Sequence, residues 1–105
     1  MQAGKLDKRV TLQQLNRTPD GAGGWTEVWA DVATVWARVS PLRGGERYEA
    51  QRIQANLSHK VTIRYRAGVT PAMRILYGGR VLQITAVIDP DERHEVLELL
   101  CEEQP

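Results

Sequence analysis

The stretch MRILYGGRVLQITAVI, residues 73–88, decides the fold class of this chain of 105 residues. Residues 73–77 and 80–88 are rich in aliphatic and β-branched side chains, which favour strands. The pair Gly78-Gly79 between them has the composition of a two-residue hairpin turn. Alternate positions of the second segment form its expected apolar face: Leu82, Ile84, Ala86 and Ile88. The stretch therefore predicts an antiparallel β-hairpin.

The residues after this hairpin predict one further strand. Asp89-Pro90-Asp91 has the signature of a type I turn, in which proline sets φ at the second position. Residues 95–102 then alternate, with Leu97, Leu99 and Cys101 on one face. Cys101 is the single cysteine and cannot form an internal disulfide, so we expect it to be a small core residue.

Residues 60–66, KVTIRYR, form the clearest half-buried strand pattern of the chain. Their alternation places Val61, Ile63 and Tyr65 on one face and polar or charged side chains on the other. We expect all three to face the core.

A second hairpin is predicted in the N-terminal half. Residues 9–13 alternate with period two, and residues 25–29 and 34–39 form a long return strand with a break or bulge at Asp31. Between the two strands, residues 16–24 are rich in turn-forming residues. We expect this loop to be mobile in the free protein.

The three tryptophans all lie on the return strand of this second hairpin. Trp36 stands among small apolar residues and is expected in the core. Trp25 and Trp29 have polar neighbours and are candidates for partly exposed interface anchors, although core packing is the stronger interpretation for at least one of them.

The segment SPLRGGERYEAQRIQANLSHK, residues 40–60, is too long for an ordinary connection between strands. Ala50, Ile53 and Leu57 follow the spacing i, i+3 and i+7, which predicts a helix of roughly three turns within residues 45–57. Its apolar stripe is thin, so the helix should depend on packing against a neighbour. We expect it to be released from the rest of the protein at modest cost.

These patterns predict a mainly β fold: a small antiparallel β-barrel or sandwich of about six strands, in one domain over residues 1–105. One short helix or long loop separates the second and third strands. The chain lacks the roughly 18 to 20 consecutive apolar residues that span a bilayer, so no membrane partner is expected. Its start, MQAGKLDKRV, does not resemble a secretion signal and indicates a cytoplasmic site of synthesis.

The net charge is only +1, but it is unevenly distributed. Residues 38–80 contain nine basic side chains against Glu46 and Glu49, whereas the balance reverses from Asp89 to the end. Opposite charges could pair across the sheet. Alternatively, they could form two surfaces of opposite sign that suit head-to-tail stacking of subunits.

The sequence offers no convincing catalytic or metal-binding pattern. The two histidines, His59 and His94, and the single cysteine do not form a recognisable ligand spacing. The Gly78-Gly79 pair is explained by a turn, and no phosphate-binding GxxxxGK[ST] motif is present. An enzyme is the weakest hypothesis, and no cofactor is expected. A basic barrel could instead bind nucleic acid, although the expected strand 60–66 has only one aromatic residue for base stacking.

Three motifs, in this order and spacing, resemble the phage head-tail joining family, the head-closure or stopper proteins of tailed phages, prophages and gene transfer particles. They are WA.V.P..G.E over residues 36–46, IRYR.G.TP.MR over residues 63–74, and DPDER over residues 89–93. The resemblance covers nearly the whole chain.

The resemblance implies a non-enzymatic neck component that forms a homo-oligomeric ring, although the isolated chain could be monomeric. Its partners would be portal or adaptor proteins, tail proteins, and double-stranded DNA that passes without sequence recognition. It would act in the virion after assembly in the host cytoplasm. Carried onto this chain, the stopper-type loop corresponds to residues 40–59.

A channel for DNA should not bind phosphates tightly, so dispersed charges of both signs suit its lining. The expected channel residues are Arg43, Glu46, Arg47, Glu49 and Arg52. The expected ring or partner interface comprises Asp20, Gly21, Gly23, Gly24, Trp25, Trp29, Glu98 and Glu102. The alternative function is a small basic β-barrel that binds nucleic acid, for which Arg47 and Arg52 would be important.

Overall fold

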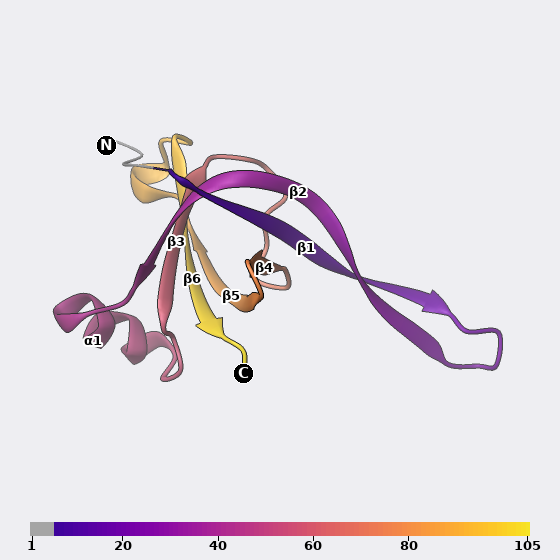
Figure 1. The fold of residues 1–105 in the computed structure, drawn as a ribbon. Helices are drawn as coiled ribbons and strands as arrows, with labels where there is room; N and C mark the ends of the chain where they lie inside the picture. Colours follow the sequence, from indigo (N-terminus) through magenta and orange to yellow (C-terminus); the bar gives the residue numbers. More distant parts are fainter. Residues whose placement is uncertain (1–5) are drawn as a thin grey trace.

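The computed structural model describes residues 6–105, except for the side chain of Ile53. Within these residues, six antiparallel strands close into a barrel in the order β1-β2-β3-β6-β5-β4 (Figure 1). The elements are β1 (Lys8–Pro19), β2 (Trp25–Pro41), α1 (Gly44–Ile53), β3 (His59–Arg64), β4 (Arg74–Tyr77), β5 (Arg80–Ile88), the 3₁₀ helix η1 (Pro90–Glu92) and β6 (Val96–Glu103). The predicted six-stranded barrel with a short helix after the second strand is confirmed.

The β4–β5 hairpin has the predicted two-residue turn. Tyr77 pairs with Arg80, and Gly78 adopts a φ of 61°, which glycine tolerates better than other residues. The inward residues of the strands form the main core. Its buried members are Val10, Leu12, Ala37, Val61, Ile63, Met73, Ile75, Leu82, Ile84, Leu97, Leu99 and Cys101. Burial of these apolar side chains is the main force that holds the barrel closed.

A bulge in β5 changes the face on which its last residues lie. Ile84 pairs with Cys101 and Ala86 pairs with Leu100, so Thr85 is an extra residue. The predicted continuous apolar face is therefore wrong after Ile84. Ala86 turns away from the main core, and Ile88 is 38% exposed.

A second bulge lies in β2, where Val32 is inserted between the residues paired with Gln13 and Leu12. This position confirms the predicted break near Asp31. The prediction that Trp36 is in the core is wrong, because Trp36 is 51% exposed. Ala37 is the buried residue at this point of the strand, and the period of two turns Trp36 to the outside.

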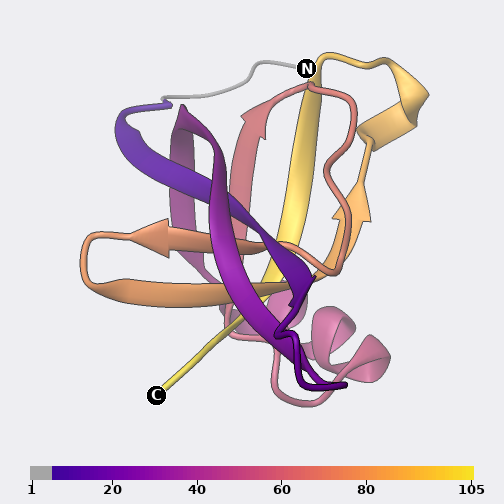
Figure 2. The same ribbon diagram turned by 90° about the vertical axis from the view of Figure 1, so that its right-hand side faces the viewer.

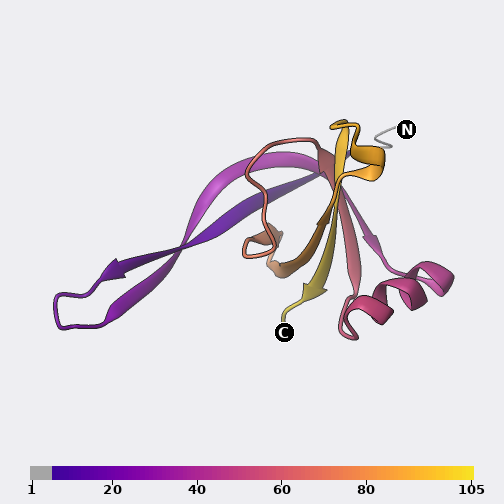
Figure 3. The same ribbon diagram turned by 180° about the vertical axis from the view of Figure 1, so that it is seen from behind.

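β1 and β2 continue beyond the barrel as a two-stranded ribbon, residues 14–30, which we call the arm (Figures 1 and 3). The arm accounts for the elongated shape, 49 × 27 × 26 Å. The loop predicted at 16–24 is confined to residues 20–24, because the strand pairing extends to Pro19 and Trp25. The mobility expected of this loop stays a prediction.

The end of β3 and the turn before β6 also differ from expectation. β3 ends at Arg64, and Tyr65 is 40% exposed and contacts the ring of His94 at 4.6 Å between centroids. The predicted burial of Tyr65 is therefore wrong. Asp91, the second central residue of the predicted type I turn, has a φ of 55°, which excludes that turn because it requires negative φ at both central positions. No helix within residues 6–105 is long and apolar enough to cross a membrane.

Candidate functional surfaces

Helix α1 is attached to the outside of the barrel by a small apolar cluster. Ala50 packs there with Leu42, Leu57 and Leu100, separately from the main core. Leu57 follows the helix, so the predicted stripe combines helix and loop residues, and the Ile53 side chain lies outside the described part of the structure. Few buried side chains therefore hold α1 in place.

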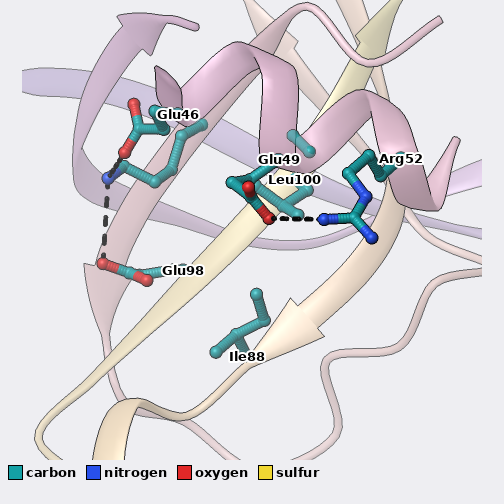
Figure 4. A pocket seen from close by; sticks show the side chains of 8 residues that line it. Glu46, Glu49, Arg52, Ile88, Glu98 and Leu100 are labelled. Carbon is teal, nitrogen blue, oxygen red and sulfur yellow. Dashed lines mark hydrogen bonds and ion pairs between the residues drawn. The ribbon is translucent and has the colours of Figure 1, made fainter. Parts of the chain in front are cut away.

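An open groove of about 580 Å³ lies between α1 and strands β5 and β6 (Figure 4). Its floor is apolar and includes Ile88 and Leu100, whereas its rim is charged. The rim residues are Glu46, Glu49, Arg52, Lys60 and Glu98. Three of the five expected channel residues, Glu46, Glu49 and Arg52, thus line the same groove as Glu98, which was expected at a partner interface.

Ion pairs connect the rim of this groove. The Lys60 Nζ lies 2.6 Å from Glu46 Oε2 and 3.9 Å from Glu98 Oε2. On α1 itself, Arg52 Nη1 is 3.7 Å from Glu49 Oε2. The Lys60–Glu46 and Arg52–Glu49 pairs are open to solvent and contribute little to stability, about 0–1 kcal/mol each. They do place carboxylates beside the cations and so lower the net positive charge of the rim.

The other two expected channel residues lie outside this groove. Arg43 precedes the first residue of α1, and Arg47 lines a neighbouring groove together with Glu102. Neither arginine makes an ion pair with another of the residues 6–105. The five expected channel residues therefore surround α1 without forming a single cluster.

The hairpin residues expected at an interface gather at the tip and along one edge of the arm. Asp20 organises the tip, since its Oδ1 accepts hydrogen bonds from the amides of Ala22 (2.8 Å) and Gly24 (3.0 Å). These bonds lower the pKa of the Asp20 carboxyl. Gly21 and Gly23 have φ values of 82° and 85°. The tip is thus a defined turn instead of an irregular loop.

The two arm tryptophans have different environments. Trp25 is 65% exposed near the tip, whereas Trp29 is half-buried at the base beneath the guanidinium of Arg74, 4.1 Å from the ring centroid. The arm and α1 project from opposite ends of the molecule (Figure 1). The expected interface is therefore divided, because Glu98 and Glu102 lie on β6 by the grooves beside α1.

The structure reveals a basic aromatic groove of about 290 Å³ that the sequence interpretation missed. Its residues are Arg9, Thr34, Val35, Trp36, Arg64, Tyr65 and Arg66. The alternation of β2 could have indicated it, because neighbouring residues of a strand face opposite sides and only one of Trp36 and Ala37 can face the core. The structure buries Ala37. Assigning Trp36 to the core concealed it.

Pairing of opposite charges across the sheet, the first interpretation of the charge pattern, is found in part. Lys60 and Arg80 pair with Glu98 and Glu103 of the acidic C-terminal strand, at 3.9 and 2.8 Å. Arg38, Arg64 and Arg66 make no ion pair with any of the residues 6–105. Cross-sheet pairing thus neutralises the α1 end of β3, whereas head-to-tail stacking between surfaces of opposite sign stays a prediction.

His59 belongs to a hydrogen-bonded network that holds the C-terminal strand. Its Nδ1 is 2.8 Å from Ser58 Oγ, and the Nε2 is 3.1 Å from Arg80 Nη2. The Glu103 amide donates to the same Ser58 Oγ at 3.0 Å. Burial and the neighbouring Arg80 lower the pKa of His59. The network therefore favours a neutral imidazole that accepts a hydrogen bond from Arg80.

The remaining reactive groups are explained by local structure. Burial raises the pKa of Cys101 to about 12, which suppresses the thiolate and makes it a poor nucleophile. His94 is exposed, with Nδ1 2.6 Å from Asp89 Oδ2. No three His, Cys, Asp or Glu side chains gather as a metal site within the part of the chain that the structure describes.

Comparisons with known proteins agree with this architecture. The family profile described as phage head completion protein matches residues 1–104. The solution structure of protein SF1141 from Shigella flexneri 2a is 34% identical, with a TM-score of 0.78 over 98% of this chain and 96% of that chain. A chain from the virion of a native gene transfer agent particle is 25% identical, with a TM-score of 0.65 over 93% of this chain and 94% of that chain. No curated protein matches.

Proposed function

The chain belongs to the phage head completion protein family, and we propose that it is the head-closure, or stopper, ring protein of a phage neck. A structural role in the phage head or neck follows from the family and from the likeness to a virion chain. In this role, the protein joins the portal or adaptor of the DNA-filled head to the tail. It carries out no catalysis and acts in the virion, after assembly in the host cytoplasm.

The arm is the observation that most strongly supports a joining function. Residues 14–19 and 25–30 pair with each other, and the pairing of β1 with β4 extends only as far as Gln13. A two-stranded ribbon is marginally stable alone, and this one exposes Trp25 and Val28. A partner that covers these side chains would stabilise the arm and gain apolar burial. We assign the tip residues 20–25 to a contact with a neighbouring ring.

The α1 segment is the proposed channel-facing element. Arg43, Arg47 and Arg52 are balanced in part by Glu46 and Glu49. Such a surface should hold phosphates weakly, because binding strength depends on the number of phosphates that are neutralised. The small cluster beneath α1 also allows it to shift without opening the main core. These two properties support a gate that contacts DNA without retaining it.

Deletion of the coding sequence from the phage or prophage that carries it tests this function. The expected result is heads that package DNA but lose it or remain tailless, with infectivity restored by the wild-type protein in trans. Complementation with Trp25→Ala should leave heads unjoined, whereas the control change Val32→Ala, at an exposed apolar residue of β2 outside the arm and α1, should retain joining. Normal tailed, infectious particles from the deletion would contradict the proposal.

A further inference from the structure

The basic aromatic groove is built as a row across three neighbouring strands. Arg9 of β1 pairs with Trp36 of β2, and the pairing of Ala37 with Ile63 places Arg64 of β3 beside Trp36 on its other side. All three side chains point outward, opposite to the buried Ala37 and Ile63. The Arg9 guanidinium lies 4.8 Å from the Trp36 ring centroid.

The groove combines exposed aromatic side chains with cations that have no ion-pair partner among residues 6–105. Arg64 and Arg66 make no ion pair with other residues in the range 6–105. Trp36, between Arg9 and Arg64 in the row, and the neighbouring Tyr65 are both exposed. Tryptophan, tyrosine and arginine are the residues most enriched in the centres of protein interfaces. The groove therefore has the composition of a protein-binding site for a partner that supplies carboxylates.

Duplex DNA fits this groove less well than a protein does. Phosphates would satisfy Arg64 and Arg66, but the bases of a duplex are stacked on one another and offer no free face to Trp36. A protein segment can supply both carboxylates and apolar atoms. The aromatic half of the groove thus favours an acidic protein segment.

This chain carries such a segment in η1. Asp91 and Glu92 are adjacent, exposed, and without an ion-pair partner in the described part of the chain. Both adopt positive φ, a sparsely populated conformation for residues other than glycine. The amide of Glu92 donates to the Asp89 carbonyl at 3.0 Å, which fixes the turn. The two carboxylates are therefore held on a defined projection.

We propose that the Asp91–Glu92 turn of one copy docks in the Arg9–Trp36–Arg64 groove of the next copy, a contact that rests on the proposed ring assembly. Figure 2 shows η1 and the N-terminal part of β1 on opposite sides of the upper end of the barrel. A contact between two different surfaces is head-to-tail, and it closes into a ring when the rotation between copies permits. The opposite charges of turn and groove set the direction of this contact.

Intermolecular paramagnetic relaxation tests the contact even when the isolated protein associates weakly. Arg93→Cys places a nitroxide beside the turn and leaves both acidic residues intact, and the buried Cys101 should not react with the label. The labelled chain is mixed with a ¹⁵N-labelled chain that carries no nitroxide, so only contacts between copies broaden its signals. We expect broadening at the Trp36 indole and at the Arg64 and Arg66 amides, and loss of this broadening in high salt.

Two controls make the result specific. A nitroxide at Glu27→Cys on the arm should leave the Trp36 indole sharp, and the ¹⁵N double variant Arg64→Glu, Arg66→Glu should lose the broadening while keeping a folded spectrum. Signals that stay sharp with the Arg93→Cys label, or broadening centred elsewhere, would overturn the proposal. A duplex DNA that shifts the Trp36 indole when the labelled chain does not broaden it would assign the groove to phosphate binding instead. None of these outcomes depends on the deletion phenotype, so the head-closure function and this interface can fail separately.

Discussion

The guanidinium of Arg74 on β4 lies 4.1 Å from the ring centroid of Trp29 on β2, and this contact fixes the base of the arm to the barrel. Arg74 Nε also donates to Gln13 Oε1 at 2.8 Å, and Gln13 Nε2 donates to Asp31 Oδ1 at 2.7 Å. The direction of the arm is therefore set at its base by four side chains from β1, β2 and β4. Towards its tip, the arm is held by its own strand pairing, by the ion pair between Arg17 and Glu27 at 3.1 Å, and by the Asp20 turn.

Arg74→Ala should loosen the arm at its base. The change removes a cation–π contact and a hydrogen bond to the buried Gln13, so we expect a loss of about 1–3 kcal/mol in the free energy of unfolding. Urea unfolding measures this loss, and amide exchange of residues 14–30 should accelerate at the same time. Arg43→Ala, at an exposed arginine without these contacts, is the matched control and should change stability by less than about 0.5 kcal/mol. Equal effects of the two changes would refute the role given to Arg74.

Trp25→Ala should separate joining from stability. Trp25 is 65% exposed, so its loss should change the free energy of unfolding by about 0.5 kcal/mol or less. The same change should abolish complementation of a deletion strain. Truncation of an interface anchor typically costs about 2 kcal/mol or more of binding free energy, which corresponds to a loss of affinity of about 30-fold or more. Wild-type complementation by Trp25→Ala would show that the tip does not contact a partner.

Stability should fall as the pH decreases through the titration of His59. The pKa of His59 is lowered by burial and by Arg80, so the unfolded chain binds its proton more readily than the folded chain. The stabilisation is present above about pH 6.5, the ordinary pKa of histidine, and is lost as the pH falls below it through the folded pKa. The slope should not exceed about 1.4 kcal/mol per pH unit for this one group.

His59→Gln is the corresponding variant, since it retains a polar side chain of similar size. Urea unfolding between pH 5 and pH 7.5 should show a flatter dependence for His59→Gln than for the wild type. The pKa of Glu103 is also lowered, mainly by its hydrogen bond with Arg80, but its contribution is lost only at lower pH. Identical slopes in the two proteins would exclude His59 as the titrating group.

Helix α1 should open more easily than the barrel. It rests on the small cluster of Leu42, Ala50, Leu57 and Leu100, whereas β3 and β6 belong to the main core. Native-state hydrogen exchange should therefore give α1 amides an opening free energy several kcal/mol below that of β3 and β6 amides. Equal protection in all three elements would make α1 a fixed cap of the barrel and would remove the support for a movable gate.

The strand pattern could be predicted because alternation reports directly on burial. The β4–β5 hairpin, the bulge near Asp31 and the core positions Leu97, Leu99 and Cys101 all followed from it. Prediction failed where one inserted residue reverses the faces, as at Thr85, and where a local apolar neighbourhood outweighed the alternation, as at Trp36. In β5 the position of the extra residue cannot be read from the sequence, because both sets of alternate residues after Ile84 include apolar side chains.

The candidate surfaces could be predicted only as segments. The sequence indicated that the α1 segment and the arm tip were unusual for their length and composition. It could not show that Glu98 approaches Lys60, or that Arg64 lies beside Trp36, because these neighbours arise from pairing between distant strands. The positive φ of Asp91 and Glu92 was equally hidden, since neither residue type requires it.

The central claim is that this barrel forms a ring in the phage neck with α1 toward the DNA channel. Cryo-electron microscopy of the assembled neck tests it most directly. We predict a ring of barrels between portal and tail, with α1 nearest the axis and the arm tip against an adjacent ring. A neck without this barrel, or a ring in which α1 faces outward, would contradict the account.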